Sequence, residues 1–305
     1  MPNRDLALAL LVVAVWGANF TVIRLGLDGV PPLLLAAIRF LLAAFPAVFF
    51  IRRPAVKFHY WLLYGLTVGV GQFGCLFYSI KIGMPAGVAS VVLQSQVFFT
   101  FLFAALLLRE TILPRQIAGL IVATAGLLLV GGVSNTAAAI APAALLLTLA
   151  ASAFWAMSNI VIRKAAASAS AEGERLDMLS LVIWTALIPP LPLLSLSLLL
   201  ESPATIATAL AGFDGKSFFA VAYLAFGATL FGYGVWSYLL SRHPASRVAP
   251  LSLLVPVAGL ITARIVLGEE LTGSQWVGCL LVVAGLVLAS FGITLRRRMP
   301  HPNRT

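Results

Sequence analysis

Polar side chains are scarce inside the long apolar runs of this sequence, and their types suit the binding of a solute better than catalysis. Trp16 and Asn19 are three residues apart and would share one face of a helix, as would Trp155 and Asn159 in the second half of the chain. A tryptophan ring offers a flat apolar surface, and an asparagine amide both donates and accepts hydrogen bonds. Each pair either lines a path for a polar solute or joins two helices, and the sequence leaves both interpretations open.

Other polar groups occur singly or in positions that cannot act together. Gln94 and Gln96 cannot share a helical face, so we expect one to face a cavity and the other to bond a neighbouring helix, with Ser90 on the Gln94 side. The remaining candidates, each a polar group or a proline that can free a backbone carbonyl, are Gln72, Tyr78, Tyr233, Trp236, Pro250 and Pro256.

Arg39 is the permanently charged side chain that stands deepest in an apolar run. As a functional group it would attract a carboxylate. As a structural group it would bond carbonyl oxygens at helix ends or extend to the membrane interface. The structural interpretation is favoured, because the corresponding run of the second half has no matching arginine.

Acidic residues and histidines stand between the apolar runs or at their ends. This distribution argues against a proton relay or a charged sodium cage at the membrane centre. The sequence also lacks HExxH, GxSxG, Walker and dinucleotide-binding motifs, so we expect no enzyme, no cofactor and no metal site. No repeated filter or ring of like residues indicates a channel. The acids are Asp5, Asp28, Glu110, Glu172, Glu174, Asp177, Glu201, Asp214, Glu269 and Glu270.

The composition places most of the chain in lipid. Of 305 residues, 61% are hydrophobic and 10% are charged, with a mean hydropathy of +1.04, whereas soluble domains carry about 25% charged residues. The net charge of +10 does not indicate a nucleic-acid partner, because the basic residues lie between apolar runs rather than on one face. Cys75 and Cys279 lie apart in apolar runs and are interpreted as packing residues.

Ten runs are long enough to cross a bilayer, which takes about 20 apolar residues in a helix. The sequence therefore predicts an all-α integral membrane protein of ten transmembrane helices. The predicted spans are Leu6 to Ile23, Pro31 to Ile51, Tyr60 to Ile80, Val88 to Leu108, Gln116 to Val133, Pro142 to Ile162, Leu179 to Leu200, Ser217 to Leu240, Val248 to Leu267 and Gln275 to Thr294.

The basic residues indicate how these spans are oriented, because lysine and arginine concentrate on the cytoplasmic side. With the N-terminus inside, only Arg24, Lys81 and Lys216 fall on the opposite side, and Arg39 and Arg264 fall within spans. We therefore expect a multi-pass protein of the bacterial inner membrane with both termini in the cytoplasm. The predicted cytoplasmic residues are Arg4, Arg52, Arg53, Lys57, Arg109, Arg115, Arg163, Lys164, Arg175, Arg242, Arg247, Arg296, Arg297, Arg298 and Arg304.

The two halves of the chain resemble each other. An offset of 139 places Trp16 on Trp155 and Arg24 on Arg163, and an offset of 159 places Glu110 on Glu269. The longer polar loops around 165–178 and 201–216 absorb the difference. The predicted units are a first repeat over 1–135, a second over 140–295 and a basic tail over 296–305. Since each half has five spans, the second repeat is inverted in the membrane, as in many secondary transporters. A duplication without a transport role is the alternative.

Several motifs resemble the EamA branch of the drug/metabolite transporter superfamily over nearly the whole chain. They are Leu10 to Phe20, Pro31-Pro32, Ile38-Arg39-Phe40, Gly83 to Gly87, Arg247 to Val257 and Glu269 to Gly273. The resemblance implies ten helices around a central cavity that is lined by helices one, three, four, six, eight and nine.

The resemblance also implies a function and a site. Within the superfamily the motifs are most similar to exporters of O-acetylserine and cysteine, so we expect alternating-access export of such cysteine-pathway metabolites, with a broader amino-acid or drug/metabolite exporter as the alternative. The expected partners are a small amino-acid-like solute and the lipid bilayer. The predicted substrate-binding residues are Trp16, Asn19, Gln72, Gln94, Trp155, Asn159, Tyr233 and Trp236.

Overall fold

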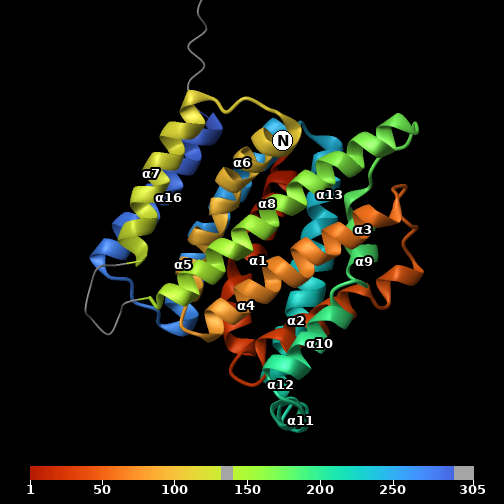
Figure 1. Ribbon diagram of the computed structural model, residues 1–305, viewed down its shortest axis with the longest axis vertical. Helices are drawn as coiled ribbons and strands as arrows, with labels where there is room; N and C mark the ends of the chain where they lie inside the picture. The colour runs from red at the N-terminus through yellow and green to blue at the C-terminus, as the bar shows by residue number, and fades with distance from the viewer. Residues whose placement is uncertain (132–139, 292–305) are drawn as a thin grey trace, which may run out of the picture.

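A computed structural model describes residues 1–131 and 140–291, and in these residues it contains helices but no strand (Figure 1). Nine helical stretches are long and apolar enough to cross a membrane, and the apolar helix Pro114–Val130 is shorter. The predicted all-α fold with ten transmembrane helices is confirmed. The ends at Val133 and Thr294 and the basic tail lie outside the described residues.

Several spans consist of two helices joined by a π-helical or 3₁₀ turn. Such turns shift backbone carbonyls out of the regular ladder and are frequent at functional sites. The spans are α1 (Asn3–Gly26); α2 (Pro32–Ala44); α3 (Phe58–Tyr64) with α4 (Phe73–Lys81); α5 (Ala86–Val92) with α6 (Gln96–Leu108); α7 (Pro114–Gly131); α8 (Pro142–Ala171); α9 (Met178–Thr185) with α10 (Pro190–Leu200); α12 (Gly215–Ala222) with α13 (Gly232–Arg242); α14 (Ala245–Val248) with α15 (Val255–Thr262); and α16 (Gly273–Phe291).

The structure differs from the sequence prediction at three places in the chain. The second span is not one helix, because α2 ends at Ala44 before Pro46, and only a short 3₁₀ helix, Ala47–Phe49, follows. The first long loop is shorter than expected, since α8 continues to Ala171 and Gly173 then adopts φ +77°. The second long loop contains an extra helix, α11 (Pro203–Ala211), whose N-cap Ser202 accepts from the backbone N–H of Thr205.

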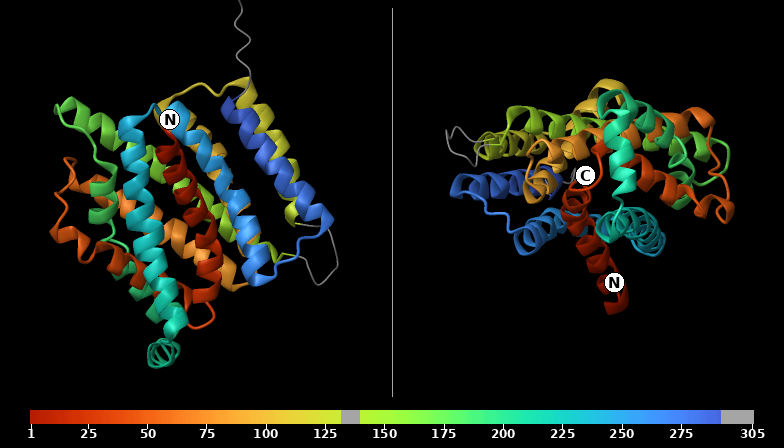
Figure 2. Two further views of the ribbon diagram at one scale, coloured as in Figure 1. Left: turned by 180° about the vertical axis from the view of Figure 1, so that it is seen from behind. Right: turned by 90° about the horizontal axis from the view of Figure 1, so that it is seen from below.

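Helices of the two halves pack against each other in matching pairs. The first span, α1, packs against α15 of the second half, and its counterpart α8 packs against α6 of the first half. The pairs α2 with α10 and α7 with α16 each join counterparts. In Figure 2, α1 runs between α13 and α15, and α7 lies beside α16 at one edge of the bundle. If the two halves exchanged places, each of these helix pairs would be replaced by an equivalent pair. This is what an internal two-fold axis requires.

Four glycines bring the backbones of α7 and α16 together. A methyl group built at Gly126 would lie 2.6 Å from the carbonyl oxygen of Gly278, and one built at Gly278 would lie 2.6 Å from that of Gly126. Gly119 and Gly285 are related in the same way at 2.5 Å. Small residues at such spacing let membrane helices approach closely, where packing and not water expulsion holds them.

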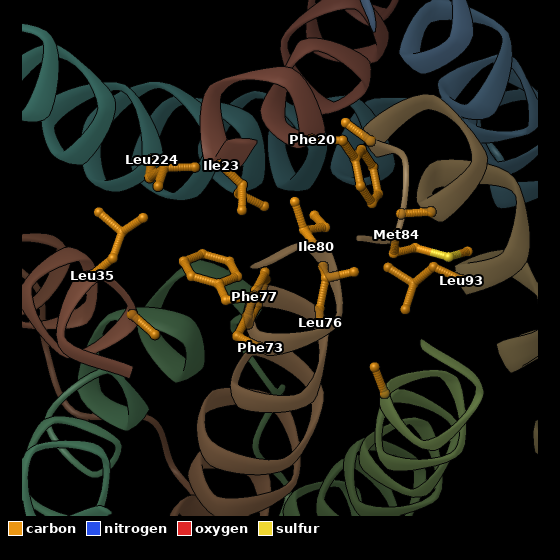
Figure 3. Close-up of a cluster of buried hydrophobic side chains, with 14 of the residues drawn as sticks. Phe20, Ile23, Leu35, Phe73, Leu76, Phe77, Ile80, Met84, Leu93 and Leu224 are labelled. Carbon is orange, nitrogen blue, oxygen red and sulfur yellow. The ribbon is translucent and has the colours of Figure 1, made fainter. Parts of the chain in front are cut away.

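The main core lies where the helices of the two halves meet at the centre. Figure 3 shows Phe73 and Phe77 of α4 directed toward Leu35 and Leu224, which come from opposite halves of the chain. Phe77, Leu35 and Leu224 are fully buried.

The second and seventh spans are joined near both of their ends. At one end the Glu201 carboxylate accepts from the backbone N–H groups of Leu33 (2.7 Å) and Leu34 (3.3 Å) at the start of α2. A carboxylate is favourable there because it meets unpaired N–H groups and the positive end of the helix dipole. At the other end Trp184 Nε1 of α9 donates to the Ile51 carbonyl (2.9 Å). These ties hold α2 in a defined position.

We expect Gly126→Ala to lower the stability of the protein. Alanine normally stabilises a helix relative to glycine, but here its methyl group would collide with the Gly278 backbone, an overpacking that costs about 1–3 kcal/mol. The thermal unfolding midpoint in detergent measures this. Gly273→Ala at the start of α16 is the control, because a methyl group there meets nothing within 4 Å. Equal midpoints for the two variants would contradict the close contact.

Candidate functional site

Three of the predicted site residues form one aromatic cluster between α1 and α13. The Trp16 ring centre lies 5.5 Å from that of Tyr233 and 5.1 Å from that of Trp236. The Trp16 indole N–H donates to the Ala228 carbonyl (2.9 Å) in the π-helical turn Tyr223–Phe231. Gly232 makes room for the indole, because a methyl group there would lie 2.4 Å from Trp16 Nε1. The first and eighth spans thus share one aromatic surface.

Arg39 is buried beside this cluster, with 2% of its surface exposed. Its Nη2 donates to Thr229 Oγ1 (2.9 Å), and the guanidinium lies 4.0 Å from the ring centre of Phe73. Nε and Nη1 have no hydrogen-bond partner among the described residues. The structural contacts expected from the sequence, bonds to carbonyl oxygens or an extension to the interface, are not those that the structure shows.

A small cavity opens beside the Arg39 guanidinium between α2, α3, α9 and the end of the π-helical turn before α13. Arg39, Tyr64, Thr185, Thr229 and Tyr233 contribute its polar lining, and the remaining residues are mostly apolar. Tyr233 belongs both to this cavity and to the aromatic cluster. The cation and the aromatic surface are therefore parts of one continuous site.

The two glutamines of the fourth span have different surroundings. Gln96 Oε1 accepts from Asn159 Nδ2 (2.8 Å), and Asn159 Nδ2 also donates to Thr100 Oγ1 (3.1 Å), so these amides join α6 to α8. Gln94 is buried, and its side chain makes no hydrogen bond to another described residue. Ser90, on the same side as Gln94, donates to the Pro256 carbonyl of α15 (3.3 Å).

The other predicted residues are not joined to the aromatic cluster by any ring contact or hydrogen bond in the described part of the chain. Asn19 and Gln72 are buried, and the amide oxygen of each has no partner there. Trp155 is partly buried and packs against the main core. Buried unpaired amide oxygens are costly in a membrane, which is compatible with a site that a solute completes.

Sequence reasoning did not single out Tyr64, Thr185 or Thr229. Each is a lone hydroxyl in an apolar run, and such residues usually bond the backbone of their own helix. Thr185 and Thr229 do so, to the Leu181 and Leu224 carbonyls, and Thr229 also accepts from Arg39. Only the packing of separate helices places these three hydroxyls at one cavity with the Arg39 guanidinium.

Two consecutive stretches of the chain, residues 4–132 and 142–291, match the model of the EamA-like transporter family. The chain belongs to this family. It is 49% identical over 297 residues to a probable amino-acid metabolite efflux pump of Salmonella typhimurium, covering 97% of this chain and 98% of that protein. A protein of Escherichia coli with the same description is 46% identical over the same shares.

The fold of this EamA-family protein is also found in a solved structure. A crystal structure with 19% sequence identity superposes with a TM-score of 0.62 and covers 95% of this chain and 97% of its own. The protein is thus a multi-pass membrane protein of a transporter family, and the resemblance stated from its motifs is confirmed. The family contains transporters, which agrees with the expectation that the protein is not an enzyme.

We expect Asn159→Ala and Gln94→Ala to differ in their effect on stability. Asn159→Ala removes the bonds between α6 and α8, and such bonds in membranes contribute about 1 kcal/mol. Gln94→Ala removes no hydrogen bond between helices and should therefore lower stability less than Asn159→Ala does.

Unfolding midpoints in detergent measure both changes. The double variant Asn159→Ala/Gln96→Ala is the control, since it should cost less than the sum of its single changes. Additive costs would show that the amides do not act together.

Proposed function

We propose that this protein exports an amino-acid metabolite, of the kind of O-acetylserine or cysteine, across the inner membrane by alternating access. Two curated relatives described as probable amino-acid metabolite efflux pumps support the solute class. An aromatic surface next to a buried cation suits a small solute that carries a carboxylate. The observation that carries the alternating-access proposal is an asymmetry between two equivalent helix-end contacts.

The first contact joins two spans at one end of the bundle. The Glu269 carboxylate, which follows the ninth span, accepts from the backbone N–H groups of Ala86 (2.7 Å) and Gly87 (3.0 Å) at the start of α5. These N–H groups have no partner within their own helix, and the helix dipole favours a carboxylate beside them. The fourth and ninth spans are therefore joined at this end.

The equivalent carboxylate at the other end makes a different contact. The offset of 159 places Glu110 on Glu269 and places the start of α14, Ala245-Ser246, on Ala86-Gly87. Glu110 forms an ion pair with Arg163 of α8. Arg163 holds the pKa of Glu110 below its ordinary value, so the pair is present at neutral pH and is lost in acid.

The repeat indicates which contacts would form in a second state, in which the two halves exchange their arrangements. Arg24 is the counterpart of Arg163, and in this structure it pairs with Asp28 and not with Glu269. In the exchanged state, Glu110 would accept from the start of α14 and Glu269 would pair with Arg24. The two states share the carboxylate contact to a helix start and the glutamate–arginine pair with the halves interchanged, whereas the Arg24–Asp28 pair has no counterpart, because Ala167 stands where the repeat places Asp28. A solute that binds one state better than the other would shift the balance between them.

The distribution of basic residues supports an orientation for these ends. With both termini in the cytoplasm, the Glu269 contact lies on the extracytoplasmic side and the Glu110–Arg163 pair lies on the cytoplasmic side. On the extracytoplasmic side the structure thus joins the fourth and ninth spans, and a cavity lined by Asp28, Lys81 and Glu201 lies at the same end.

We expect Glu269→Gln to expose the amides of Ala86 and Gly87. Each hydrogen bond to a charged group contributes about 1.5–3 kcal/mol, so a weaker amide acceptor should raise their hydrogen-exchange rate about tenfold or more, measured by mass spectrometry. Glu270→Gln is the control, because that neighbour instead pairs with Arg264. Unchanged exchange in Glu269→Gln would contradict the contact.

Transport itself is tested with labelled O-acetylserine in inside-out vesicles, where export becomes accumulation. We expect saturable uptake that cysteine competes for, and at least about a tenfold lower kcat/KM in Gln94→Ala, because the unpaired amide is then lost from the site. Vesicles with an empty vector are the control. No uptake above this control, with folded protein present, would remove the solute class, and non-saturating flux would indicate a channel.

A further inference from the structure

We infer that Arg39 is the anion-binding group of the solute site and takes the carboxylate of the exported metabolite. This inference rests on the proposed function and deepens it, because it names the chemical group by which the solute is recognised. The sequence favoured a structural role for Arg39, so the argument depends on what surrounds the guanidinium.

The first step is that the guanidinium is buried without a counter-ion. Arg39 is 2% exposed, and none of the ten acids, all of which are among the described residues, forms an ion pair with it. A cation removed from water without a carboxylate is strongly unfavourable, and an arginine does not escape this cost by losing its proton. A buried charge kept at such a cost is, by default, a functional group.

The second step is that the protein leaves part of the guanidinium unused. Thr229 Oγ1 accepts from Nη2, whereas Nε and Nη1 have no acceptor in the described chain. The planar arrangement of guanidinium donors matches the two oxygens of a carboxylate. Arg39 lines a small cavity, although Nε and Nη1 themselves are enclosed in this state, so a solute reaches them only when the surrounding helices move apart.

The third step is that aromatic rings hold the cation without neutralising it. The guanidinium lies 4.0 Å from the ring centre of Phe73 and 5.0 Å from that of Phe40. Figure 3 shows Phe73 as part of the main core, so this ring is fixed in place. Stacking on fixed rings orients a guanidinium and leaves its edges free for hydrogen bonds.

The fourth step is that groups able to contact the rest of a small zwitterionic solute lie next to Arg39. Tyr64 and Tyr233 line the same cavity and carry hydroxyl groups that both donate and accept. Tyr233 leads on to the rings of Trp16 and Trp236, which offer an apolar surface. A carboxylate on Arg39 would thus place an apolar or ester group toward the aromatic cluster.

The test compares O-acetylserine with its neutral carboxamide on the purified full-length protein in detergent. Dissociation constants are obtained from tryptophan fluorescence and from the ligand-induced shift of the unfolding midpoint. We expect the wild type to prefer the carboxylate and Arg39→Gln to bind it about 100-fold more weakly, as for the loss of one partner of a buried charge pair. The carboxamide should bind both proteins alike.

Two further variants separate recognition from structure. Lys57→Gln removes an exposed positive charge that pairs with Glu172 and should keep the carboxylate preference of the wild type. Arg39→Met keeps an apolar stem among the rings, so without ligand its unfolding midpoint should equal or exceed that of the wild type. A large fall in that midpoint, with carboxylate preference retained in Arg39→Gln, would overturn the inference.

The outcomes also separate this inference from the proposed function. If Arg39→Gln transports and binds the carboxylate as the wild type does, Arg39 is not the anion-binding group, although the export proposal stands. If the wild type binds no amino-acid-like solute, the export proposal fails, and acetate, propionate and benzoate are then tested. Stabilisation of the wild type but not of Arg39→Gln by these anions would support the Arg39 site, and its absence would overturn it.

A conservative variant keeps the test decisive if Arg39→Gln does not fold. Arg39→Lys retains the charge but replaces the fork of donors with a single ammonium. We expect about tenfold weaker binding of the carboxylate and unchanged binding of the carboxamide. Equal weakening of both ligands would contradict the role of Arg39 as the carboxylate partner.

Discussion

Lipid cannot hydrogen-bond to a protein, so every polar group inside the spans has to find a partner within the chain or be completed by a solute. Most of the polar groups here are satisfied in the first way. Glu201 and Glu269 accept hydrogen bonds from the free N–H groups at the starts of α2 and α5. Asn159 donates to Gln96, which joins α8 to α6. Against this background, the unused donors of Arg39 and the unpaired amide oxygens of Asn19 and Gln72 stand out. These exceptions are the basis for the solute site proposed above.

The internal repeat is the basis of the proposed alternating access. Counterpart helices such as α7 and α16 contact each other through reciprocal glycine pairs, so this interface is the same when the halves are exchanged. The contacts of Glu110 and Glu269 are not the same, although the two residues are counterparts. Symmetric contacts therefore form a frame common to both halves, and in the proposed cycle the asymmetric contacts at the helix ends would differ between the two states.

The position of Arg39 follows from that frame. The start of its helix, α2, is bonded to Glu201 of the seventh span, the segment after α2 is bonded to Trp184, and the Phe73 ring that stacks on its guanidinium belongs to the main core. A guanidinium held this rigidly does not move to another hydrogen-bond acceptor in the protein. Preorganised donors of this kind bind an anion without a large cost in conformational entropy.

The sequence alone determined the features that depend on local chemistry and on repetition. Ten apolar runs, the match of Trp16 with Trp155 and the family motifs were enough to predict the ten-helix fold and the transporter family, because the length of a span follows from bilayer thickness. Similarly, the spacing of Gln94 and Gln96 was enough to predict that they would differ in their surroundings. The break of the second span at Pro46 and the helix α11 were missed, since apolar runs hide local helix ends.

Only the tertiary structure decided which polar groups meet. Arg39, Tyr64 and Thr229 belong to the second, third and eighth spans, and no spacing rule relates residues of different helices. Whether Asn159 lines a path or joins helices was likewise undecided until Gln96 was found opposite it. The physical reason is that helical periodicity shows which residues share a face of one helix, whereas the partner of that face is chosen by the packing of all ten helices together.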